Sequence, residues 1–164
     1  ARTVGGDGNL LLNVGPMPDG RIEPRQVEGL KQVGAWLVKY GESVYGTRGG
    51  PFKPGDYGVS TRKGNTIYLH VLEWPDGALK LPATPAKVMR SRVLGGGKAE
   101  VRHTAAGLEV SVADSDRQPM DTVVALVIKN TASRLAVTRT KRSCVFMIVG
   151  LVWVLVGVGG LNIL

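Results

Sequence analysis

The pattern of apolar and polar positions over the first 47 residues predicts a strand, a loop and a helix. Residues 9–14 form a short, nearly continuous apolar run between two glycines, which is typical of a strand buried on both faces. Turn-forming residues follow at 15–20. Apolar residues then recur at helical spacing from Val27 to Leu37, after a proline suited to a first helical turn. A strand with two apolar faces needs neighbouring strands, which the pattern of this chain does not provide.

After residue 47 the pattern changes to short segments of alternating polarity separated by turn signals. Two of them alternate cleanly, at 66–72 and 108–112. Glycine-rich turns separate the segments, as at 95–97. The spacing predicts an antiparallel β-sandwich over residues 48–129. The expected strands are 57–61, 66–72, 78–81, 87–94, 99–103, 108–112 and 122–128.

A third region, 130–164, differs from both. It carries four basic side chains and no acid, and residues 144–161 form a run of 18 residues without charge. This run is a candidate transmembrane segment with a positive flank, near the lower length limit for a spanning helix. Its valines and four glycines disfavour a helix. A non-native extension and a pair of apolar strands are the alternatives.

Charge and composition exclude several classes of function. The net charge is +8, but residues 1–129 mix 17 basic with 13 acidic side chains, and only 5% of all residues are aromatic. A nucleic-acid-binding surface would gather its bases together with stacking aromatics, so no nucleic-acid partner is expected. The single cysteine and two isolated histidines, His70 and His103, predict neither a disulfide framework nor a metal site. No cofactor is predicted.

Several segments, in order, resemble parts of the α-L-fucosidase family of glycoside hydrolases. GNLLLNVGPMPDG (8–20) resembles that family's last barrel strand and loop. IEP (22–24), GAWL (34–37) and GESVYGT (41–47) are similar to its final helix and exit. TRKGNTIY (61–68) with HVLEWP (70–75) resembles the first strands of its C-terminal sandwich, and DTVVALVI (121–128) its closing strand. The similarity is collinear over about residues 1–128.

The resemblance implies a mainly β fold. A C-terminal antiparallel β-sandwich (48–129) would follow the last strand, loop and helix (1–47) of a truncated (β/α)8-like barrel, with the basic then apolar tail (130–164) after it. The implied reaction is retaining release of terminal α-L-fucose from glycans. The implied partners are fucosylated glycans bound by the full-length enzyme, and the implied location is secreted, periplasmic or lysosome-like. The tail instead suggests a membrane anchor through 144–161.

The resemblance also places the family's nucleophile and acid/base carboxylates before this segment. No catalytic residue is therefore assigned, and the chain alone is predicted to be inactive. Asn13, at the end of the first strand, is the candidate substrate-binding residue, and the competing role for its side chain is to satisfy loop backbone. Asp19 is interpreted as a turn former and Glu23 as a helix-start charge.

An alternative function is a non-catalytic accessory or carbohydrate-binding sandwich, membrane-tethered if the tail is an anchor. Trp74 is the residue on which this alternative depends. An aromatic ring at a strand end is suited to stacking on a sugar, whereas a Trp before a proline is also typical of a packing anchor against the barrel.

Overall fold

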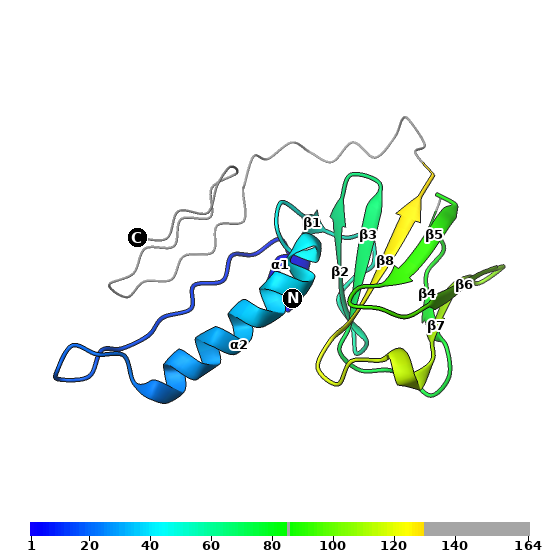
Figure 1. Ribbon diagram of the computed structural model, residues 1–164. Coiled ribbons are helices and arrows are strands. Elements are labelled where there is room, and N and C mark those ends of the chain that lie inside the picture. Colours follow the sequence, from blue (N-terminus) through cyan, green and yellow to red (C-terminus); the bar gives the residue numbers. More distant parts are fainter. Residues whose placement is uncertain (85, 130–164) are drawn as a thin grey trace.

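The computed structural model describes residues 1–84 and 86–129 (Figure 1). The predicted region 130–164, with its candidate transmembrane segment at 144–161, lies outside the described residues. Within them, no helix is both long and apolar enough to cross a membrane.

Short strands dominate the described part of the chain. The helices are α1 (Arg2–Gly5) and α2 (Pro24–Tyr40), followed by single 3₁₀ turns at Gly41–Ser43 and Asp114–Asp116. The strands are β1 (Arg48–Gly49), β2 (Gly58–Lys63), β3 (Thr66–Val71), β4 (Leu79–Leu81), β5 (Val88–Val93), β6 (Ala99–Thr104), β7 (Gly107–Val112) and β8 (Thr122–Ile128). All seven strands expected from the sequence are confirmed as β2 to β8.

Two antiparallel sheets pack against each other. One has the strand order β1-β2-β3-β8-β5 and the other β4-β7-β6. Alternate residues of both sheets, such as Leu69 on β3 and Val110 on β7, are fully buried in one core cluster. The period-2 pattern arises because every second side chain points into the space between the sheets. The mainly β, antiparallel fold predicted from the sequence is therefore confirmed.

The larger sheet is also buried on its outer face. Tyr68, Val123 and Ala125 point away from the core between the sheets and form a second cluster with Tyr40, at the end of α2. Trp36 packs against this cluster from the preceding turn of the helix. The C-terminal end of α2 therefore covers the sheet, whereas its N-terminal end projects away from both sheets (Figure 1).

Helix α2 begins where the sequence predicts. Pro24 is its first residue, and the carboxylate of Glu23 accepts a hydrogen bond from the Gln26 backbone N–H at 3.1 Å. This contact satisfies one of the free N–H groups of the first turn, which is the normal role of an N-cap. The interpretation of Glu23 as a helix-start residue is thus confirmed, and the helix ends at Tyr40, before Gly41.

The predicted strand at 9–14 is not confirmed in the described residues. The segment forms no strand, and none of the described strands pairs with it. Leu10 and Leu11 are 39% and 56% exposed, and only Val14 in this run is buried. An apolar run favours a buried strand only where other strands offer backbone partners. The two sheets here are completed without it.

Replacing Leu126 by alanine should lower the free energy of unfolding by about 2–5 kcal/mol, because it removes a fully buried side chain from the core between the sheets. Chemical denaturation followed by circular dichroism measures the change. Val38→Ala, on the exposed face of α2, is the control and should change stability by less than about 0.5 kcal/mol. Equal effects of the two substitutions would contradict the assigned core.

Candidate functional sites

The polar residues singled out at the start of the chain lie on its surface. Asn13 is exposed within the extended segment that follows α1, so its substrate-binding role stays a prediction. Asp19 accepts hydrogen bonds from the Arg21 backbone N–H at 3.0 Å and from Arg21 Nε at 2.7 Å. These bonds to the Arg21 side chain and backbone hold the pKa of the Asp19 carboxyl below its usual value. Asp19 thus belongs to a turn, as the sequence indicates.

Asp7 is the other acidic residue of this segment. Its carboxylate accepts a hydrogen bond from the Gly49 backbone N–H at 2.7 Å and forms an ion pair with Arg48 at 3.3 Å. Asp7 has a positive φ of 59°, a conformation that aspartate tolerates better than most residues. Its contacts attach the loop after α1 to β1. Asp7, Asp19 and Glu23 therefore all have structural roles.

A buried histidine–carboxylate pair lies beneath α2. His70 Nδ1 is 2.8 Å from Asp121 Oδ2, and the side chains are 0% and 6% exposed. An ionised carboxylate can only accept hydrogen bonds. Nδ1 therefore carries a hydrogen, and its N–H group donates a hydrogen bond to Asp121. The Trp36 ring lies 6.2 Å from the His70 ring, centroid to centroid. Among the described residues, His70 Nε2 and Asp121 Oδ1 find no hydrogen-bond partner although both atoms are buried.

Asp121 also lines a cavity of about 400 Å³ between the N-terminal segment, α2 and the ends of β3 and β8. Its wall is mainly apolar, with Val33, Trp36 and Leu37 from α2. The Ala1 amino group reaches the same cavity, where burial lowers its pKa more than the nearby Asp121 charge raises it. The lining is formed by Ala1, Leu10, Gly29, Gln32, Val33, Trp36, Leu37, Val44, Leu72, Met120 and Asp121.

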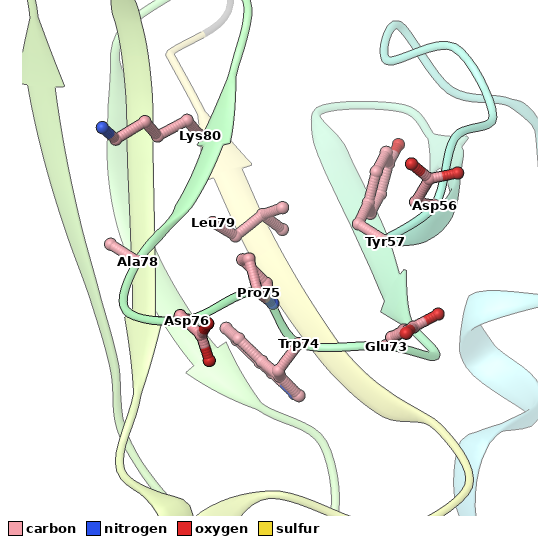
Figure 2. A pocket seen from close by; sticks show the side chains of 9 residues that line it. All are labelled: Asp56, Tyr57, Glu73, Trp74, Pro75, Asp76, Ala78, Leu79 and Lys80. Atoms are coloured by element: carbon pink, nitrogen blue, oxygen red, sulfur yellow. The ribbon is translucent and has the colours of Figure 1, made fainter.

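A second, more polar cleft of about 530 Å³ lies where the two sheets meet (Figure 2). Its walls come from the residues before β2, the loop after β3 and the start of β4. Asp56, Tyr57 and Glu73 lie on one side and Asp76 on the other, with Pro75 and Leu79 between them, as Figure 2 shows. The lining residues are Asp56, Tyr57, Glu73, Trp74, Pro75, Asp76, Ala78, Leu79 and Lys80.

Trp74 is held firmly at this cleft. Its Nε1–H donates to Thr122 Oγ1 at 3.2 Å, and the Arg117 guanidinium lies 4.5 Å from its ring centroid. The ring packs against the core between the sheets. The packing role expected of Trp74 is therefore present, with the sandwich core as the surface it packs against. The same residue lines an open cleft, so a role in ligand binding is compatible with its packing.

Sequence reasoning missed both the His70–Asp121 pair and the second cleft. The partners of the pair are 51 positions apart, so no local pattern connects them. His70 also alternates with apolar residues on β3, which is the pattern of an exposed polar residue. The pair becomes visible only once β3 is known to pair with β8. That antiparallel pairing sets His70 opposite Val123, two positions beyond Asp121. The cleft is formed by three segments that are separate in the sequence. Of its residues, the sequence indicated only Trp74 as a candidate for ligand binding.

Comparison with known proteins supports a single family. The family model described as α-L-fucosidase matches residues 1–42. An α-L-fucosidase of Branchiostoma floridae is 41% identical over 81 residues, which are 46% of this chain and 18% of that protein. The tissue α-L-fucosidase of Homo sapiens is 39% identical over 84 residues, 49% of this chain and 18% of that protein.

Solved structures agree with the sequence comparison. α-L-Fucosidase isoenzyme 1 from Paenibacillus thiaminolyticus matches with a TM-score of 0.70 and 29% identity, covering 78% of this chain and 32% of that chain. A Bacteroides thetaiotaomicron α-L-fucosidase, trapped as a covalent intermediate with 2-fluoro-fucosyl fluoride, matches with a TM-score of 0.69 and 27% identity. It covers 78% of this chain and 30% of that chain.

The chain is therefore similar to α-L-fucosidases both in sequence and in fold. It spans about a fifth of the length of the curated relatives that it matches.

Replacing Asp121 by alanine should lower the free energy of unfolding by about 1–3 kcal/mol, because the buried Nδ1–H of His70 loses its acceptor. Asp114→Ala is the control, since Asp114 is 88% exposed in its ion pair with Arg117, and it should cost at most about 1 kcal/mol. Urea denaturation of both variants measures the difference. A fully stable Asp121→Ala protein would show that the pair contributes nothing to the fold.

Proposed function

We propose that this chain is the C-terminal region of an enzyme that releases terminal α-L-fucose from glycans with retention of configuration. The observation that carries the proposal is the joint match to α-L-fucosidases, in sequence over residues 1–42 and in fold over 78% of the chain. A related structure holds a covalent intermediate. Such an intermediate is the hallmark of the retaining mechanism, in which one carboxylate attacks the anomeric carbon.

Retaining hydrolysis needs two carboxyl groups about 5–5.5 Å apart on either side of the scissile bond. The acidic residues nearest the proposed barrel segment have other roles. Asp7 binds Gly49 and Arg48, Asp19 binds Arg21, and Glu23 caps α2. The nucleophile and the acid/base residue are accordingly proposed to lie in the enzyme outside this chain, with Asn13 lining the substrate site beside them.

The exposed apolar surface supports a position next to further protein. Leu10, Leu11, Val33, Val38 and Met120 are all at least 39% exposed. Three of them, Leu10, Val33 and Met120, line the cavity at Asp121. Exposed apolar side chains gathered around a cavity are typical of an interface. We infer that 1–47 is the last strand–loop–helix unit of a (β/α)8-like barrel and that residues 9–14 become a strand beside neighbouring barrel strands.

The proposed domain organisation follows from this position. Residues 1–47 would complete the barrel, and 48–129 would form the sandwich that packs on it through Tyr40, Tyr68 and Trp36. The proposed substrates are fucosylated glycans bound by the complete enzyme. The competing function, a carbohydrate-binding module without catalysis, is favoured by one observation, the aromatic and acidic cleft at Trp74.

The purified chain should not hydrolyse p-nitrophenyl α-L-fucoside. A chimera in which residues 1–129 replace the matching segment of the Branchiostoma floridae enzyme should hydrolyse it with retention, as shown by NMR of the released sugar. The unmodified Branchiostoma enzyme is the positive control, and circular dichroism verifies that the chimera is folded. A folded but inactive chimera would contradict the proposal, as would turnover by the chain alone that Asp19→Asn or Glu23→Gln abolishes.

Asn13→Ala in the same chimera should lower kcat/KM about five- to thirteen-fold, because loss of one hydrogen bond to the sugar costs roughly 1–1.5 kcal/mol. Asn9→Ala is the matched control, since Asn9 is an exposed asparagine of the same segment. Steady-state kinetics of the three proteins measures the effect. If Asn13→Ala and Asn9→Ala behave alike, Asn13 has no role in substrate binding.

A further inference from the structure

The cleft at Trp74 has the size and rigidity of a ligand site. Its volume of about 530 Å³ lies within the range of small-molecule sites, about 300–1,000 Å³. It is lined by the residues just before β2 and by the loop between β3 and β4, and Leu79 and Lys80 of β4 complete it (Figure 2). Its rim includes the turn at Gly77, whose φ of +89° only glycine adopts readily and whose α-carbon faces open space.

Two aromatic rings are fixed in position before any ligand arrives. The Tyr57 hydroxyl donates to the Lys53 carbonyl at 3.2 Å, and the Trp74 indole donates to Thr122 Oγ1 at 3.2 Å. Burial raises the pKa of Tyr57 above its ordinary value, so its hydroxyl stays protonated at neutral pH. Rings that are already ordered lose little conformational entropy when a flat apolar surface packs on them.

The polar groups of the cleft are hydrogen-bond acceptors spread along its walls. The three carboxylates belong to Asp56, Glu73 and Asp76, and the Lys80 amine points away from the cleft (Figure 2). Within residues 1–84 and 86–129, no three acidic, His or Cys side chains gather closely enough to hold a metal ion. Dispersed acceptors favour a ligand with several separate hydroxyl donors over a compact cation.

We propose that the Trp74 cleft binds a neutral oligosaccharide. The apolar C–H face of a pyranose ring packs on Tyr57 and on the part of the Trp74 ring that Arg117 and the core leave exposed, while its hydroxyls donate to Glu73, Asp76 and Asp56. The site is separate from the cavity at Asp121 and shares no lining residue with it. It does not require the chain to hydrolyse anything, so the proposal is independent of the hydrolase function.

The test is a titration of the full chain with cellotetraose and with 2′-fucosyllactose, followed by the NMR signal of the Trp74 indole N–H. Saturable shifts of this signal with at least one of the two sugars are expected. The double variant Glu73→Ala, Asp76→Ala should raise the Kd at least about tenfold, because it removes two charge-assisted acceptors. Glu28→Ala, an exposed carboxylate on α2, is the matched control and should leave the Kd unchanged.

The substitutions spare Trp74 itself, because its ring packs against the core and its loss would confound binding with stability. Both exchanged residues are exposed, and the circular dichroism spectrum of the double variant should match that of the parent chain. Three results would overturn the proposal. They are a Trp74 signal unaffected by both sugars, equal affinity in the double variant and the parent, and binding only of a tetra-arginine peptide used as the cationic competitor.

Discussion

The pairing of β3 with β8 is the interaction on which the rest of the structure depends. Val123, Val124, Ala125 and Leu126 are at most 1% exposed, because β8 is covered by protein on both faces and bordered by β3 and β5 on both edges. One face supplies the core between the sheets, and the other supplies the surface on which α2 rests. The same pairing brings Asp121 to His70 and Thr122 to Trp74. The pairing therefore helps to position Asp121 at the cavity and Trp74 at the cleft.

The sequence located the strands and the helix correctly wherever only one face of the element is buried. The alternation in 108–112 located β7, because its apolar residues point into one core. Pro24 located the start of α2, because proline is suited to a first helical turn through its local backbone chemistry. The sequence also located β3, but it did not predict that the second face of this strand is buried. Tyr68 and His70 look like solvent-facing residues, and only the helix packed above them explains their burial.

For residues 9–14 the sequence predicted burial that the described residues do not show. Their apolar run indicates that these side chains are suited to burial, but it does not say whether the partners are within reach. In the described residues Leu10 and Leu11 are exposed, and Leu10 lines the cavity at Asp121, whose buried Oδ1 has no hydrogen-bond donor. Such a surface lowers the stability and solubility of an isolated protein. The curated relatives are about five times longer than the segment matched here, and the proposed position of this chain beside further protein gives a physical reason for the exposed surface.

The central claim is that residues 9–14 become a strand when the rest of an α-L-fucosidase surrounds them. Amide hydrogen exchange at Leu10, Leu11 and Leu12 tests it most directly, measured in the isolated chain and in the Branchiostoma chimera. The account predicts rapid exchange in the chain alone and strong protection in the chimera, where neighbouring strands accept these hydrogen bonds. Equal, rapid exchange in both proteins would contradict it.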